Sequence, residues 1–481
     1  MRPLFALLLA ASLFSTVLSG CLDPAGTDRD APDPPPSLFL PALVCDPVCN
    51  SVASGVATPA NEPHIAVNPR NPLNIVAGGN DYTGPVADSW TGYYYSNDGG
   101  KTWTRGLTPG CPGCTPTVPP SPLSAFGLAG DAVVAFDKDG NAYLSGLATR
   151  RAGLTSSGGS AIFVSKSTDG GATWPQVTLV HTLDGTAGFH DKEWIATGPN
   201  GEVYVAWALF LASSLPSIVF SRSVDGGRTW LPAPVVISDL AGASLANQGA
   251  IVVVGSDGTL YVTWIDHATR RIVLARSTDR GDTWTRPTEV ARITPIGQLP
   301  NAAYRTPDLH TFAIDASDGP TKDALYVAWH DKRNGDADIF LSRSLDGGAT
   351  WSAPLRVNDD EVGNGKDQWM PGISVSDAGL VSLLFYDRRE DSANKLLRTY
   401  YAWSDGERVL GNFALSDVAF DGDLGKGSAV GGAINPQASF MGDYQAIASG
   451  PGFAIGIWAD TRTGATTNSD LYTARVQLPT R

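Results

Sequence analysis

The stretch Ser96-Asn-Asp-Gly-Gly-Lys-Thr-Trp103 decides the fold, because its pattern Ser-x-Asp-x-Gly-x-Thr-Trp occurs five times along the chain. The other four copies begin at Ser167, Ser223, Ser277 and Ser344. Repeats at this spacing each form one small sheet, which cannot bury both of its faces alone and packs against its neighbours. The sequence therefore predicts a series of similar sheets that stack on one another.

A longer unit precedes each signature: an apolar strand, a turn with Gly or Asn, a second strand that often ends in Trp, a loop and a third strand. β-branched and aromatic runs bounded by Gly, Asn and Asp are typical of strands. The unit recurs seven times, with first strands that begin near Ile65, Val133, Ile195, Ile251, Phe312, Ile373 and Ile447. The predicted fold is all-β, a β-propeller of seven four-stranded blades, with six blades as the alternative.

The last blade needs an outer strand from elsewhere. The sixth unit keeps only the remnant Ser404-Asp-Gly406, and the seventh ends near Val476 without a signature. An open sheet edge invites pairing with other chains, and closing the ring removes it. We expect the segment Leu38–Val44 to add the missing strand and so to join the two ends of the chain.

The N-terminus has the features of an export signal. Arg2 is followed by an apolar run from Leu4 to Val17 and then by Leu18-Ser-Gly-Cys21. This pattern is typical of a signal peptide over 1–20, and its ending resembles a lipobox in which Cys21 is lipidated; plain secretion is the alternative. Residues 21–54 are rich in turn-formers and are predicted to form an extended tether, which leaves 55–481 as the propeller. We expect an exported lipoprotein, anchored in a membrane and facing the cell exterior or the periplasm.

The remaining cysteines fall into two close pairs, Cys45 with Cys49 and Cys111 with Cys114. In an exported chain these residues are predicted to form disulfides, with a zinc site as the alternative. The net charge of −14 argues against a nucleic-acid partner, since such proteins need clustered Lys and Arg. No cofactor is expected. The acidic turns Asn358–Glu361 and Asp421–Asp423 leave a structural calcium ion open, although neither matches a twelve-residue calcium loop.

The signature resembles the Asp-box of bacterial neuraminidase repeats, and residues 60–478 resemble the sialidase-like propeller superfamily. In that family the box forms the turn between the third and fourth strands of a blade. Gly allows the positive φ that the turn needs, Asp accepts backbone N–H groups, and Trp packs between blades. The resemblance implies a structural role for the box aspartates, which are Asp98, Asp169, Asp225, Asp279 and Asp346.

The face opposite the boxes is the predicted functional face. Because strands alternate in direction, the loops before the first strands and after the second strands lie together on that face. Ligand sites commonly form where many loops meet on a rigid base. The polar residues that these loops carry include Glu62, His64, Asp131, Asp191, Lys192, Glu193, Asn247, Gln248, Arg305, Asp308, His310, Asp367 and Asp443.

Sialidases of the superfamily hold the substrate carboxylate with three arginines and use an aspartic acid as proton donor and a tyrosine, activated by a glutamate, as nucleophile. The predicted mouth offers Arg305, Arg389 and Arg462 for the clamp, Tyr444 and Glu193 as nucleophile and partner, Asp131 or Asp191 as proton donor, and Trp194 and Trp369 for stacking on a sugar. The family's Phe/Tyr-Arg-Ile-Pro sequence is absent from the first blade, where Glu62-Pro-His-Ile65 stands instead.

Two other interpretations fit the same mouth. One is a hydrolase of neutral glycans that uses two carboxylates from the set Asp131, Asp191, Asp308, Asp367 and Asp443. The other is a non-catalytic surface propeller that binds glycan or protein. The Asp-x-Arg element also repeats in three successive blades, which favours local Asp–Arg pairs that brace a loop over ligand binding. The sequence thus predicts a cell-surface propeller directed at glycans, with catalysis and binding both open.

Overall fold

The computed structural model describes residues 41–45, 49–56, 58–84, 89–114, 121–150, 158–185, 187–211, 216–238, 246–425, 439–463 and 469–479. All of them belong to one compact unit, Leu40–Arg481. The predicted signal peptide, Cys21 and most of the predicted tether lie outside the described residues. Within the ranges given, no helix is long and apolar enough to cross a membrane.

The strands form seven antiparallel sheets, and each sheet is one blade. Blades 1 and 2 are β3 (Ala60–Val67), β4 (Ile75–Asp81), β5 (Trp90–Ser96), β6 (Thr104–Leu107), and β7 (Leu128–Phe136), β8 (Ala142–Thr149), β9 (Gly159–Ser167), β10 (Gln176–Asp184). Blades 3 and 4 are β11 (Gly188–Thr197), β12 (Val203–Leu211), β13 (Ser217–Ser223), β14 (Val235–Val236), and β15 (Asn247–Val254), β16 (Leu260–Asp266), β17 (Arg271–Ser277), β18 (Thr288–Arg292).

The other blades follow the same order of strands. Blades 5 and 6 are β19 (His310–Ile314), β20 (Leu325–Asp331), β21 (Asp338–Ser344), β22 (Leu355–Arg356), and β23 (Gln368–Val375), β24 (Val381–Asp387), β25 (Arg398–Ser404), β26 (Val409–Ala414). Blade 7 is β27 (Ala446–Gly450), β28 (Phe453–Asp460) and β29 (Asp470–Gln477), and two short 3-10 helices lie in the connections, η1 (Pro122–Ala125) and η2 (Gly422–Leu424).

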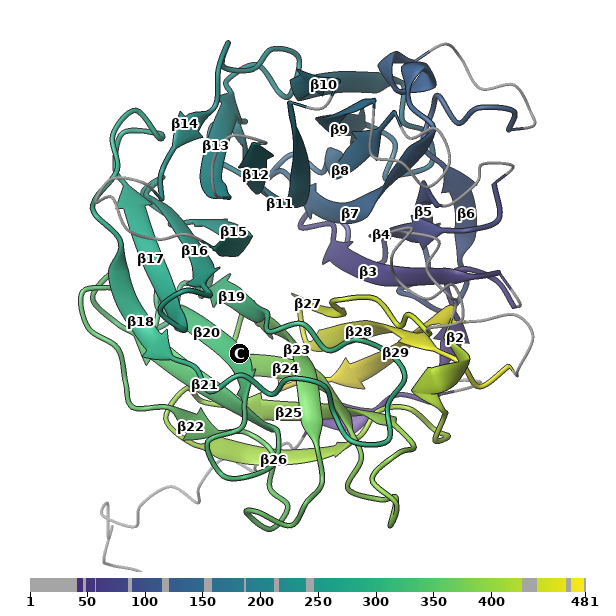
Figure 1. Ribbon diagram of the computed structural model, residues 1–481, viewed down its shortest axis with the longest axis vertical. Coiled ribbons are helices and arrows are strands. Elements are labelled where there is room, and N and C mark those ends of the chain that lie inside the picture. Colours follow the sequence, from purple (N-terminus) through teal and green to yellow (C-terminus); the bar gives the residue numbers. More distant parts are fainter. Residues whose placement is uncertain are drawn as a thin grey trace, which may run out of the picture. The chain divides into compact units, whose positions relative to one another are not determined.

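The first strand of each blade faces the centre of the ring (Figure 1), and these strands contact their counterparts in the neighbouring blades, including β27 of the last blade and β3 of the first. The predicted fold class is therefore confirmed, with seven blades and not six. Apolar side chains between neighbouring sheets form the core, which is why the second strands read as nearly continuous hydrophobic runs.

Two strands from the N-terminal side complete blade 7. Strand β1 (Ala42–Leu43) pairs with β29 at Ala42↔Gln477 and Leu43↔Val476, as expected for the closing segment. Strand β2 (Ser51–Val52), inside the stretch predicted as a tether, pairs with β29 as well, at Ser51↔Thr473. Both ends of the described chain are thus held in one sheet, and the outer edge of blade 7 is covered.

The Asp-box turns have the predicted geometry. In blade 1 the Ser96 hydroxyl and the Thr102 N–H donate to Asp98 Oδ1 at 2.7 and 2.9 Å, and the Thr102 hydroxyl donates to Oδ2 at 2.6 Å. The same bonds recur around the other box aspartates, for example at Asp279. Hydrogen bonds from Thr283 lower the pKa of Asp279 to about 2, so this carboxylate stays ionised as a turn acceptor.

A box glycine also allows each turn to approach the preceding blade. Gly281 has φ +89°, and a Cβ atom added there would lie 2.2 Å from the ring of Phe220 in blade 3. Any larger residue would have to displace that ring, which itself packs on Trp284 at 5.0 Å between ring centroids. The boxes are therefore inter-blade packing elements.

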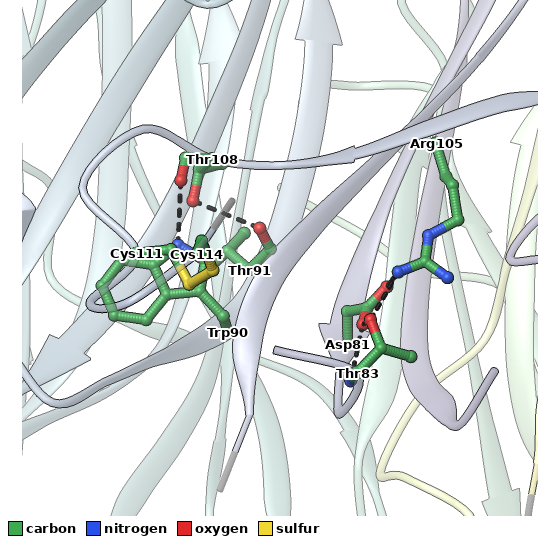
Figure 2. The surroundings of a disulfide bond; sticks show 8 residues. All are labelled: Asp81, Thr83, Trp90, Thr91, Arg105, Thr108, Cys111 and Cys114. Atoms are coloured by element: carbon green, nitrogen blue, oxygen red, sulfur yellow. Dashed lines mark hydrogen bonds and ion pairs between the residues drawn. A yellow bond between two sulfur atoms is a disulfide. The ribbon is translucent and has the colours of Figure 1, made fainter. Parts of the chain in front are cut away.

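The four described cysteines form two disulfides, Cys45–Cys49 and Cys111–Cys114. Figure 2 shows the second one next to Trp90, whose indole N–H donates to the backbone carbonyl of Thr108 at 2.9 Å. This disulfide closes the loop that leads from blade 1 to blade 2. Disulfides are typical of proteins outside the reducing cytosol.

Candidate functional site

Among the described innermost strands, five carry a β-bulge at an equivalent position, in β3, β7, β11, β15 and β23. At each bulge one residue has a positive φ; these residues are Glu62 (52°), Asp131 (57°), Lys192 (48°), Gly249 (71°) and Met370 (58°). Non-glycine residues rarely adopt this conformation, and bulges next to functional sites re-aim side chains. Three successive blades use this bulge to place a charged residue near the axis.

Lys192 and Asp443 form the centre of the resulting cluster. Lys192 Nζ donates to Asp443 Oδ2 at 2.6 Å and lies 3.9 Å from Glu62 Oε1. Arg305 reaches the same carboxylate from another loop, with Nε and Nη2 donating to its two oxygens at 2.7 and 2.6 Å. Asp443, which is 3 % exposed, is therefore an ionised carboxylate held between two cations.

The other carboxyl groups surround this pair. Asn80 Nδ2 donates to Glu62 Oε2 at 2.6 Å, and its Oδ1 accepts the Asp131 N–H at 2.7 Å. Asp131 lies close enough to Glu62 for its charge to raise the pKa of the Glu62 carboxyl. Gln248 Nε2 donates to Asp191 Oδ2 at 2.6 Å. Four carboxyl groups from blades 1, 2 and 3 and from the approach to blade 7 thus lie around Lys192.

The surroundings push the pKa values of these groups in opposite directions. Burial raises the pKa of Glu62 well above its ordinary value, with Asp131 adding to the rise, and burial also raises the pKa values of Asp131 and Asp191. Burial opposes ionisation of Asp443, but Lys192 and Arg305 outweigh it and lower its pKa. Carboxyl groups with opposed shifts at one site divide into proton holders and ionised groups, which is the requirement for acid and base roles.

A cavity of about 690 Å³ opens onto this cluster and is lined at one end by Glu62, Asp131, Asp191, Lys192 and Asp443. Its size is typical of a site for a drug-sized or disaccharide-sized ligand. Many of its other lining residues come from blades 2 and 3, and Asn80, Tyr82, Arg305 and Phe440 also line it. The carboxyl groups are therefore at a wall that a ligand can reach.

A buried arginine positions the loop that carries Arg305. Arg388 has no exposed surface, donates to the Pro300 carbonyl at 2.7 Å and to the Tyr304 hydroxyl at 2.6 Å, and lies 3.7 Å from Asp367. Burying an unpaired guanidinium is costly, so these contacts hold the loop between β18 and β19 firmly. Arg388 was not among the residues singled out from the sequence.

Glu193 and Tyr444 line a second cavity of about 40 Å³ near the axis, together with His310 and His330. Tyr444 Oη and Glu193 Oε2 have no hydrogen-bond partner among the described residues, so the two groups are not bonded to each other. Burial and the neighbouring carboxyl groups, Asp131 first, raise the pKa of Tyr444 well above its ordinary value. Burial likewise raises the pKa of Glu193. The raised pKa values disfavour the ionised carboxylate and the ionised phenol on which activation of this nucleophile would depend.

Arg389 and Arg462 do not meet Arg305 at the cavity. Arg389 binds Asp387 at 2.8 Å and also contacts Asp359, and its guanidinium lies over the Tyr400 ring. Arg462 makes the equivalent contact with Asp460 at 2.6 Å. Both are local braces of the loop after the second strand, and the structure brings only Arg305 of the three candidate clamp residues to the cavity wall.

The same brace recurs in blades 5 and 1. Arg333 binds Asp331 and covers the Phe340 ring. In blade 1, Asp81 ends β4, accepts the Thr83 N–H at 2.9 Å and lies 3.7 Å from Arg105 on β6, as Figure 2 shows. The repeated carboxylates are fully buried, which explains why the element recurs: each one satisfies the backbone at the end of a buried strand.

Neither candidate tryptophan offers a free platform for a sugar. Trp369 is 1 % exposed and stacks on Tyr304 with ring centroids 6.0 Å apart. Trp194 is partly buried, meets His64 edge to face at 4.8 Å and lines the smaller cavity. Both indoles pack between blades.

The other acidic candidates have local partners. Asp308 lies 3.5 Å from His330 Nε2, and Asp367 accepts the Asn394 amide at 2.6 Å. In the acidic turns, Asp359 pairs with Arg389, and Asp421 and Asp423 bind Lys395 at 3.0 and 3.4 Å. The described residues contain no group of three or more His, Cys, Asp or Glu side chains arranged to hold a metal ion.

Residues 94–105 match the model of the BNR/Asp-box repeat. The chain carries this repeat. A search of curated proteins found no match.

Several solved structures are similar to this chain at low identity. A protein of unknown function from Dyadobacter fermentans is 13% identical over 91% of this chain and 99% of its own, with a TM-score of 0.47. The Hadza microbial sialidase Hz136 is 15% identical over 84% of this chain and 73% of its own, with a TM-score of 0.46. An ulvan lyase of family PL25 is 11% identical over 88% of this chain and 95% of its own, with a TM-score of 0.48. At these values the likenesses do not identify a substrate or an activity.

Proposed function

We propose that this protein hydrolyses neutral glycosides at the axial end of the larger cavity. The observation that carries the proposal is a cavity of about 690 Å³ whose wall brings Asp131 and Asp191 together with Asp443, the carboxylate held between Lys192 and Arg305. Glycoside hydrolysis requires one carboxyl group that donates a proton and another that is ionised, on either side of the scissile bond.

Asp131 is the proposed proton donor. It lines the cavity, and burial raises its pKa, which favours the protonated form. Asp191 is the proposed second carboxylate, which activates water or attacks the sugar; Lys192 and the amide of Gln248 favour its ionised form. Because the charge of Asp191 raises the pKa of Asp131, Asp191 loses its proton first in this scheme, and it is then the base while Asp131 is the acid.

Asp443 has a different role in this scheme. Both of its oxygens accept hydrogen bonds from Lys192 or Arg305, so it is not free to attack a sugar. As a fixed negative charge beside the cavity, it stabilises the positive charge that develops on the sugar ring in the transition state. Lys192 in turn offsets part of the repulsion among the four neighbouring carboxyl groups, which raise its own pKa.

The cation pattern favours a neutral substrate over a sialic acid. Recognition of a substrate carboxylate needs guanidinium groups with free donors, and Arg305 already binds Asp443 with two of its donors. Arg150, at the other end of the cavity, pairs with Asp184 at 2.7 Å. Carboxyl groups dominate the remaining polar wall, and they would repel an anionic sugar.

The test is a panel of neutral aryl glycosides, with a fluorogenic sialoside alongside, incubated with the purified protein. We expect sugar release from at least one neutral glycoside and none from the sialoside. Release from the sialoside would contradict the neutral substrate class. Retention on a glycan array without release from any neutral glycoside would contradict hydrolysis and support a non-catalytic glycan-binding propeller.

The export and membrane anchoring predicted from the N-terminus belong to this proposal. The two disulfides support a location outside the cytosol. The lipid anchor at Cys21 lies outside the described residues and stays a prediction.

A further inference from the structure

The wall of the larger cavity has two chemically different parts. Glu62, Asp131, Asp191 and Asp443 form one part, and a group of apolar side chains from blades 2 and 3 forms another. The apolar wall consists of Leu128 and Leu147 of blade 2 and Phe189, Phe210 and Leu211 of blade 3. Thr149, Arg150 and Ser160 also line the cavity, so the apolar wall is a patch beside polar groups.

Strand β11 contributes one residue to each of the two parts of the cavity wall. Phe189 and Asp191 are two positions apart on the strand, and both line the cavity. Residues at this spacing point to the same face and lie about 7 Å apart along a strand. The apolar wall therefore begins about one sugar ring away from the proposed second carboxylate.

The residue between Phe189 and Asp191 is held in place by polar contacts. His190 has no exposed surface; its Nδ1 and Nε2 lie 2.7 Å from Ser160 Oγ and 2.8 Å from His181 Nδ1. Burial lowers its pKa to about 3, so the ring stays neutral at ordinary pH. This chain of contacts fixes β11 against blade 2 and so fixes the directions of Phe189 and Asp191.

Leu128 and Leu147 of the apolar wall are buried, whereas two residues of blade 3 are exposed. Phe189 is 39% exposed and Leu211 is 36% exposed, although both belong to a cavity wall. Phe189 packs on Phe210 with ring centroids 6.3 Å apart, so the two rings form a continuous surface. Clustered apolar side chains that face open space in a cavity are typical of binding surfaces for apolar groups.

We infer that the substrate is a glycoside with an apolar aglycone, such as an alkyl or lipid chain, whose sugar binds among the carboxyl groups while the aglycone lies on Leu128, Leu147, Phe189, Phe210 and Leu211. The inference rests on the proposed function in placing the scissile bond at the axial end. Binding of the aglycone is independent of turnover, so the two can fail separately.

The test compares the binding of octyl and methyl β-D-glucopyranoside to the full protein by calorimetry, below the micelle concentration of the octyl compound. We expect saturable one-to-one binding of the octyl glycoside and at least about tenfold weaker binding of the methyl glycoside, since each buried CH₂ group strengthens binding several-fold. Phe189→Asp should abolish this preference. The matched control is Leu410→Asp on β26, because Leu410 is also 39% exposed but lies outside the cavity.

Equal binding of the two glycosides to the wild-type protein would overturn the inference, as would a preference that survives Phe189→Asp or disappears equally in Leu410→Asp. Octyl glycoside bound at the cavity without turnover of any glycoside would instead sustain the inference and contradict the proposed hydrolysis. Turnover of a neutral glycoside without any preference for the octyl chain would support the proposed hydrolysis and overturn the inference.

Discussion

Asp131→Asn is expected to lower kcat on the best neutral glycoside by about 10²- to 10⁴-fold and to leave KM within a few-fold of the wild-type value. The amide cannot donate a proton to a leaving oxygen. It should preserve the fold, because Asn tolerates the positive φ of 57° at this position and keeps a polar group against Glu62. The measurement is steady-state kinetics of wild type and variant on the same substrate.

The matched control is Asp308→Asn, another carboxylate of the functional face, which pairs with His330 and does not line the larger cavity. This control should keep wild-type kcat within a few-fold. Equal losses in both variants would show that any change on this face reduces activity, and full activity of Asp131→Asn would remove Asp131 from the mechanism.

The wild-type pH profile should follow from the same groups. Asp131 acts while protonated, and because its pKa is raised, the rate should fall as pH rises through a value above the usual range of an aspartic acid. On the acidic side, the rate should fall as the second carboxylate becomes protonated, which gives a bell-shaped profile. A rate that is constant across the carboxyl range would contradict the pairing of Asp131 with Asp191.

Asp443→Asn is expected to lower the free energy of unfolding by about 3 kcal/mol, at the lower end of the range for breaking a buried ion pair. The change leaves Lys192, whose side chain is 11% exposed, without its partner at 2.6 Å. We take the lower end because Arg305, with its side chain 50% exposed, can turn to water. Urea unfolding of both proteins near neutral pH measures the difference.

The control for this change is Asp405→Asn, which removes an exposed ion pair with Arg408 and should change stability by less than about 0.5 kcal/mol. The loss in Asp443→Asn should also shrink in acid. The pKa of Asp443 is lowered in the folded protein, so its contribution is complete above the unfolded value of about 3.9 and is lost as pH falls through the folded value. A loss as small as that of Asp405→Asn near neutral pH would show that Lys192 finds other partners.

The propeller could be predicted from the sequence because its deciding contacts are local and repeated. The turn at Asp98 is satisfied by residues within four positions of it, so the pattern that forms it is visible in the chain. The closure by β1 was also predictable, because a missing outer strand leaves an edge to cover. Strand β2 was missed, since its two residues, Ser51 and Val52, carry no strand pattern of their own.

The face of the site was predictable from strand direction, and so was the presence of Asp131, Asp191 and Arg305 near one another. The arrangement of the residues within that face was not predictable. Lys192 is central because of a bulge with positive φ, and the only hint in the sequence is that the equivalent position of blade 4 is Gly249. A positive φ at a charged residue follows from tertiary packing, which no local pattern reports.

Arg389 and Arg462 show that residue type alone does not identify a binding residue. Their residue type fits a carboxylate clamp, but each lies two positions after an aspartate that needs a buried partner, and that short-range pairing takes the guanidinium. Arg305 has no aspartate at this spacing, which left it free to reach Asp443 across the ring. The repeated Asp-x-Arg spacing was the signal that distinguished the two cases.

The most direct test of the central claim is a crystal structure of Asp131→Asn with an uncleaved neutral glycoside. We predict that the sugar lies at the axial end of the larger cavity, with its glycosidic oxygen within hydrogen-bonding distance of the residue 131 side chain and its ring beside Asp191. A glycoside bound on the face that carries the Asp-boxes, or bound in the cavity with its glycosidic oxygen beyond reach of residues 131 and 191, would contradict the account.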